Sequence, residues 1–109
     1  MGYLTYGNTT TPFEIDDELM AHLRVVVVTK LRRNESFALT LNTTEGAVET
    51  LWVHASIPLR FTMEEDVDLQ RPLLVSMMDS ANSAGGLDLT RGDFEPSLRR
   101  SRGLHAMSA

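Results

Sequence analysis

The chain has 109 residues and a formal net charge of −5, with 42% apolar and 23% charged residues. This composition excludes a wholly disordered protein and provides enough apolar side chains for one modest core. The absence of cysteine excludes a disulfide framework, a thiolate metal site and a cysteine nucleophile. No apolar run is long enough to cross a bilayer and no signal segment begins the chain, so we expect a cytoplasmic protein without a membrane partner.

Charge divides the chain near residue 90. Residues 1–90 hold 13 acidic and 6 basic residues, whereas residues 91–109 hold 2 acidic residues and 4 arginines. The second stretch is also rich in small and polar residues and has no apolar periodicity. We therefore predict a single domain over residues 1–90 and a flexible basic tail over residues 91–109.

The first part of the domain predicts a loose hairpin and a helix. Two short β-type segments, Tyr3–Tyr6 and Pro12–Ile15, flank the turn pair Gly7–Asn8. A helix is predicted from Asp17 to Arg33, with Asp16 or Asp17 as its N-cap and basic residues in its last turn. Four consecutive valines would also suit a strand, but the cap and the length of the apolar stripe favour the helix. The apolar positions at helical spacing are Met20, Leu23, Val27 and Leu31.

Three strands are predicted next. Ser36–Asn42 and Val48–His54 form a second hairpin around a turn in which Gly46 takes the left-handed conformation. Ile57–Met63 follows as a third strand, and Pro58 places it at an edge or at a strand start.

A second helix over about residues 70–83 begins at Pro72 and is ended by Gly85–Gly86. Leu87–Leu89 is a last short strand. The predicted order is ββ-α-βββ-α-β, which indicates an α+β fold with two helices on one face of a mainly antiparallel sheet.

The turn of the second hairpin leaves two registers open. A three-residue turn, Thr44–Gly46, pairs Leu39 with Leu51 and leaves Thr50, Trp52 and His54 on the open face. A four-residue turn reverses the second strand and moves Trp52 into the core. The first register predicts an open face that combines Thr40, Trp52, His54, Arg60 and Thr62.

Motifs for covalent chemistry are missing. Lys30 is the single lysine, and its surroundings lack the glycine-rich phosphate loop and the Lys-x-Asp-Gly pattern of nucleotidyl transfer. His54 and Ser56 are close in sequence but point in different directions along an extended segment. We therefore predict no catalytic residue, no metal site and no cofactor, and the sequence favours a protein that is not an enzyme.

Two surfaces are candidates for binding. The first would hold nucleic acid through a basic helix end, although cations at a helix C-terminus also relieve its dipole. The second would bind a partner through a tryptophan and its neighbours, although the tryptophan would equally suit a core position. The nucleic-acid set is Arg24, Lys30, Arg32, Arg33 and Arg60. The partner set is Trp52, His54 and Arg60.

The chain resembles a family of short, uncharacterised actinobacterial and phage proteins, over roughly residues 1–90. Many members of that family carry the label "ATP-dependent DNA ligase", so the resemblance implies an accessory role in DNA transactions. The blocks that carry it are Tyr6-Gly7, Ala21 to Leu23, Thr29 to Phe37, His54 to Phe61 and Ser80 to Gly86.

The sequence thus favours a small non-catalytic binding or adaptor module. The alternative is an accessory protein that binds nucleic acid through the basic helix end. The expected partner is a protein or a nucleic acid, and an exposed edge strand could also pair two copies in a homodimer.

Overall fold

The structure is a computed structural model that describes residues 1–8, 11–91 and 94. It confirms the α+β class and the predicted order of strands and helices. The elements are β1 (Gly2–Tyr6), β2 (Phe13–Ile15), α1 (Asp17–Arg32), β3 (Phe37–Asn42), β4 (Val48–Val53), β5 (Leu59–Thr62), α2 (Arg71–Ala81) and β6 (Leu87–Asp88).

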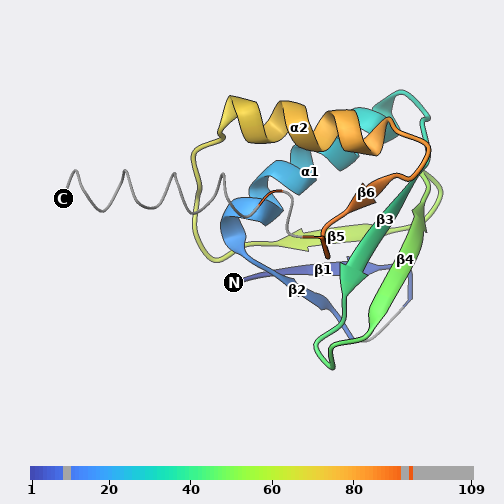
Figure 1. Ribbon diagram of the computed structural model, residues 1–109. Helices are drawn as coiled ribbons and strands as arrows, with labels where there is room; N and C mark the ends of the chain where they lie inside the picture. The colour runs from blue at the N-terminus through green and yellow to red at the C-terminus, as the bar shows by residue number, and fades with distance from the viewer. Residues whose placement is uncertain (9–10, 92–93, 95–109) are drawn as a thin grey trace, which may run out of the picture.

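The strands form two sheets of three rather than the single predicted sheet, with orders β2-β1-β5 and β4-β3-β6 (Figure 1). All pairs are antiparallel except β3–β6. The sheets separate because a turn, closed by Ile57 N–H donating to His54 O at 3.1 Å, carries the chain away from β4. The Trp52 carbonyl on β4 then accepts a hydrogen bond from the Tyr6 hydroxyl instead of pairing with β5.

The β3–β4 hairpin settles the register of the two strands. Leu39 pairs with Leu51 and Phe37 with Val53, which confirms the alternative with a three-residue turn. Gly46 has a φ of +88°, as the predicted left-handed position requires. Trp52 therefore lies on the outer face of its sheet and is 61% exposed.

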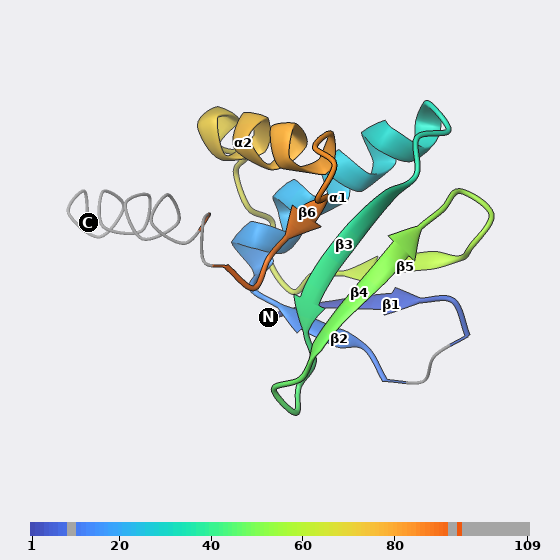
Figure 2. The ribbon, with the colours of Figure 1, turned by 45° about the vertical axis from the view of Figure 1, so that its right-hand side comes forward.

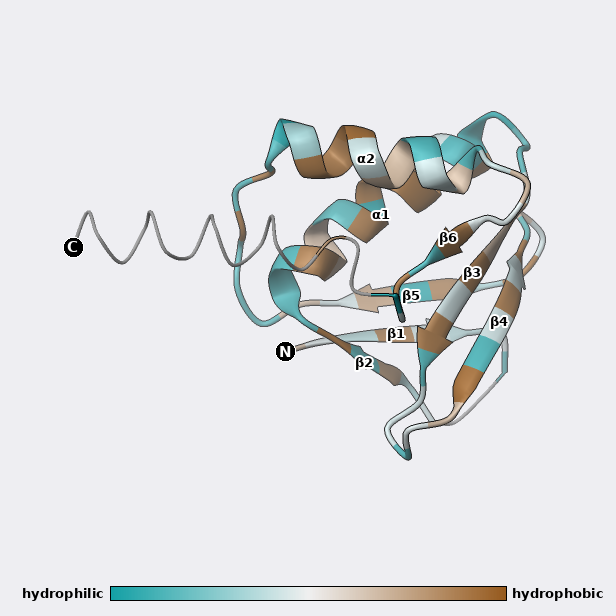
Figure 3. Cartoon of the chain, in the orientation of Figure 1, coloured by the Kyte–Doolittle hydropathy of each residue, from teal (hydrophilic) through white to brown (hydrophobic). Residues whose placement is uncertain are grey.

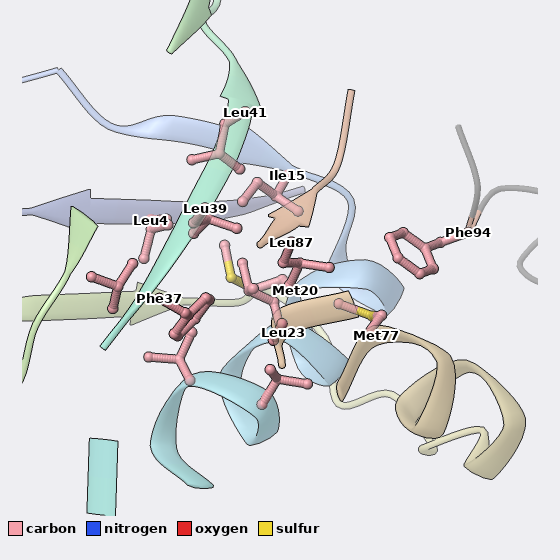
Figure 4. Close-up of a cluster of buried hydrophobic side chains, with 14 of the residues drawn as sticks. Leu4, Ile15, Met20, Leu23, Phe37, Leu39, Leu41, Met77, Leu87 and Phe94 are labelled. Atoms are coloured by element: carbon pink, nitrogen blue, oxygen red, sulfur yellow. The ribbon is translucent and has the colours of Figure 1, made fainter. Parts of the chain in front are cut away.

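The core lies where the inner faces of the two sheets meet α1 and α2 (Figure 4). Apolar and polar residues alternate along the helices and strands (Figure 3). Asp16 caps α1 by accepting the Glu18 N–H at 3.2 Å, and this bond fixes where the helix begins. Fully buried members of the core include Leu4, Met20, Leu23, Val26, Leu39, Leu41, Val53, Leu73, Met77 and Leu87.

A buried histidine joins α1 to the start of α2. His22 Nδ1 lies 2.6 Å from the Glu18 carbonyl, and His22 Nε2 accepts the Gln70 N–H at 2.7 Å. These partners place the proton of a neutral imidazole on Nδ1. Both ring nitrogens are used, so His22 has a structural role in holding α2 over α1.

The end of α2 differs from the prediction. The helix stops at Ala81 and is capped by Asn82, before the two glycines that were expected to end it. Gly86 instead lies against β3, because a Cβ on it would be 2.4 Å from the Ala38 carbonyl oxygen. Its φ is also positive, at +75°. Gly86 thus permits the chain to enter β6 beside β3 (Figure 2).

Part of the predicted tail belongs to the core. Phe94 is 4% exposed and packs near Met77 (Figure 4). Residues 92–93 and 95–109, which make up most of the stretch predicted to be a flexible tail, lie outside the described residues.

We expect Gly86→Ala to lower the free energy of unfolding by about 2–3 kcal/mol, since a Cβ meets the β3 backbone and an unfavourable φ. Gly85→Ala is the matched control, because nothing lies within 4 Å of a Cβ there and its φ is not positive. Urea unfolding followed by circular dichroism measures both variants. Equal stability of the two variants would contradict the close approach.

The stability of the fold should depend on pH through Asp88, at the end of β6. Its Oδ1 accepts from Thr90 Oγ1 at 2.5 Å and from Thr90 N–H at 2.8 Å. The hydrogen bond from the Thr90 side chain lowers the pKa of Asp88, helped by the Thr90 backbone and Arg91 and opposed by burial. A pKa lower in the folded state stabilises the fold above the unfolded value of about 3.9, and the effect is lost as the pH falls through the folded pKa.

Asp88→Asn should therefore lower stability at pH 7 by a fraction of a kcal/mol, because solvent screens the site. The difference from wild type should shrink in acid. Urea unfolding across this pH range tests the sign, and a difference that grows on acidification would refute it.

Candidate functional site

Two hollows open on the surface of the described residues. One is a groove between the second half of α1 and β5, with a volume of about 380 Å³. The other is a wedge between the end of β1 and the start of β2 on one side and the β3–β4 hairpin on the other, with a volume of about 440 Å³. The α1–β5 groove is lined by Val27, Val28, Leu31, Arg32, Ala55, Ile57, Leu59 and Phe61.

The run of four valines gives α1 an apolar wall on this side. Val26 and Val27 are buried in the core, whereas the next residue, Val28, is 44% exposed and forms the upper edge of the groove. On a helix at the surface of a protein, exposed positions outside the buried apolar stripe are usually polar. Val28 is thus available for contact with another molecule.

The opposite wall is an edge strand. Among the strands of the described residues, β5 pairs with β1 alone and so leaves its other side unpaired. Gly7 N–H donates to Pro58 O at 2.8 Å, and this bond fixes which β5 residues face β1, because hydrogen-bonded pairs alternate along an antiparallel ladder. The backbone N–H and C=O groups of Leu59 and Phe61 therefore point away from β1. Their side chains line the groove.

The groove carries a positive charge, and two further arginines lie on the elements that form it. Arg32 is the single charged residue among the described residues that line it. Arg24 is also exposed and stands on the same helical face as Val28 and Arg32, since these positions are four residues apart. Arg60 is exposed on β5 but projects from the other side of the strand, next to Thr5.

The structure divides the predicted nucleic-acid set. Arg24, Arg32 and Arg33 are exposed, but Lys30 is only 6% exposed. Its Nζ donates to Asn82 Oδ1 at 2.6 Å and lies 3.4 Å from Glu35 Oε1, so it ties the end of α1 to the end of α2. Lys30 is thus engaged inside the fold rather than presented beside the arginines.

The predicted partner set is also divided. Trp52 is on β4 and His54 directly follows it, whereas Arg60 is on β5 in the other sheet. His54 Nδ1 accepts the Ser56 N–H at 3.1 Å and lies 2.8 Å from Ser56 Oγ, which closes a local turn. Trp52, His54 and Arg60 therefore do not lie together on one face of one sheet.

Tyr6 stands between the two sheets. Burial raises the pKa of its hydroxyl, and a backbone hydrogen bond at His54 opposes this in part. A neutral hydroxyl is the form that donates to the Trp52 carbonyl.

Within residues 1–8, 11–91 and 94, no group of three or more His, Asp or Glu side chains is placed to hold a metal ion. No helix in the same part of the chain is long and apolar enough to cross a membrane.

The sequence reasoning missed both hollows. Val28 could have indicated the α1–β5 groove, because it is an apolar residue outside the buried stripe of the helix. Glu49 could have indicated the wedge, since it interrupts the apolar alternation that Leu51 and Val53 continue. Leu59 and Phe61 gave no such indication, because their expected place was under the helices of a single sheet.

We expect Lys30→Met to lower the free energy of unfolding by about 1–2 kcal/mol, since it keeps the side-chain stem but removes a charged hydrogen bond. Arg33→Met is the control and should change stability by less than about 0.5 kcal/mol, because Arg33 is exposed. Thermal and urea unfolding measure both. Equal effects would contradict the structural role of Lys30.

A family model described as a domain of unknown function, DUF7882, matches residues 1–92. No curated protein and no solved structure matches the chain.

Proposed function

The chain belongs to the DUF7882 family, and we propose that it is a non-catalytic module that binds an extended acidic and apolar segment of a partner protein in the α1–β5 groove. The observation that carries the proposal is the open edge of β5 beneath an exposed apolar wall of α1.

Strand addition explains how such a segment would bind. An extended peptide would pair with the outward backbone groups of Leu59 and Phe61 and so add a fourth strand to the β2-β1-β5 sheet. Alternate peptide side chains would then point toward α1, where Val28 and Leu31 offer an apolar surface. The other side chains would face the side of the sheet from which Arg60 projects.

The charges favour an acidic segment. Arg32 stands at the helical wall, Arg24 lies two helical turns before it, and Arg60 stands on the far face of β5. Each could meet a carboxylate of the peptide, while the apolar groove would exclude water from part of the contact. A basic segment would meet the arginines with like charge.

DNA binding is the competing function. Arg24, Arg32 and Arg33 are exposed at and near the end of α1, and such arginines contact phosphates in many proteins. The described residues favour the peptide, because Lys30 is tied into the fold and all described residues of the groove lining except Arg32 are apolar, which suits peptide side chains better than phosphates.

The test uses a heptapeptide in which glutamate and valine alternate, followed by amide chemical shifts of the protein. We expect shifts at Leu59 to Thr62 and along α1. Val28→Glu should weaken binding at least tenfold, since it replaces an apolar contact by a like charge. Val75→Glu is the matched control, because Val75 is a valine on α2 with 50% exposure and does not line the groove.

Three further outcomes decide between the functions. Equal binding of a peptide with lysine in place of glutamate, or an equal loss in Val75→Glu, would refute the peptide site. Salt-dependent retention of a short DNA duplex that is lost in Arg32→Glu/Arg33→Glu would establish the nucleic-acid function instead.

A further inference from the structure

We infer that the wedge between the two sheets is a binding site for a small organic ammonium ion, with Glu49 as its counter-ion. This site is separate from the α1–β5 groove and does not depend on the proposed function. The wedge is lined by Tyr6, Asn8, Thr11, Pro12, Phe13, Thr43, Thr44, Glu49 and Leu51.

The wedge opens because the two sheets separate toward the tip of the β3–β4 hairpin. Along the inner side of β4, Val53 is buried, Leu51 is half-buried and Glu49 is exposed. Phe13 on β2 and Tyr6 at the end of β1 belong to the facing sheet. The space of about 440 Å³ between them is of the size that holds small ligands in proteins.

Glu49 occupies a position that the fold would normally give to an apolar residue. It pairs with Leu41, which is buried, and it lies on the same side of β4 as Leu51 and Val53. No hydrogen bond or ion pair joins its carboxylate to another described residue. A polar residue that breaks the strand pattern without a structural partner is typical of a site kept for function.

The lining chemistry selects a cation with an apolar body. Glu49 is the single charged residue among the described residues of the wedge, so an anion would be repelled. The ring of Tyr6 can attract an ammonium group, while Phe13, Leu51 and Pro12 would contact its hydrocarbon part. A neutral ligand would displace water from the Glu49 carboxylate without supplying a positive charge to offset the lost hydration.

The remaining polar groups of the wedge suit the same ligand. Thr43 Oγ1 already accepts the Ala47 N–H at 3.0 Å, and a hydroxyl oxygen has a second lone pair. This lone pair and the Asn8 side-chain carbonyl oxygen are acceptors for the N–H donors of a primary ammonium group.

The experiment titrates the protein with phenethylammonium and with 2-phenylethanol, in which a hydroxyl replaces the ammonium group, and follows the backbone amide shifts. We expect shifts at Phe13, Thr43, Thr44 and Leu51, and about tenfold tighter binding of the ammonium than of the alcohol. Glu49→Gln should remove this preference and leave the fold intact, because Glu49 is exposed.

Glu45→Gln is the matched control. Glu45 is an exposed residue in the turn of the same hairpin and does not line the wedge, so the preference should remain. Equal binding of the ammonium and the alcohol, an equal loss in Glu45→Gln, or shifts confined to other parts of the surface would each overturn the inference.

Discussion

The structure depends on the burial of two small sheets against one another and against α1. A sheet of three strands is stable only when its apolar face is covered. Leu4 from one sheet, Leu39 from the other and Met20 from α1 are fully buried in the common core that meets this need. Because strands twist, the layers cannot stay in contact along their whole length. The α1–β5 groove lies between a helix and an edge strand, and the wedge lies between the two sheets.

Local sequence patterns predicted the helices and strands, but they could not predict which distant strands pair. Caps, apolar periodicity and turn residues gave every helix and strand in the correct order, because each of these acts within a few residues. They could not show that β5 pairs with β1 rather than with β4, since its apolar face would fit either neighbour. For the same reason the sequence could not show that Lys30 is bonded to Asn82, which is distant in sequence. Lys30 was therefore grouped with the exposed arginines of the predicted nucleic-acid set.

The two hollows carry charges of opposite sign. Arg32 stands in the α1–β5 groove and Glu49 in the wedge, and the described lining of each contains no other charge. Long-range attraction follows the net charge of a protein, which here is negative. A cation would therefore reach the wedge with the help of the overall field, whereas an acidic peptide would approach the groove against it and depend on close contacts.

The central position of β1 has a consequence for folding during synthesis. β1 is near the start of the chain, yet its second partner, β5, is made only after α1 and the whole β3–β4 hairpin. Until β5 leaves the ribosome, the emerging chain holds β1 with one unpaired edge. Such edges attract other chains, and pairings between distant segments form slowly. The nascent chain is consequently most exposed to misassembly while α1 and the hairpin are being translated.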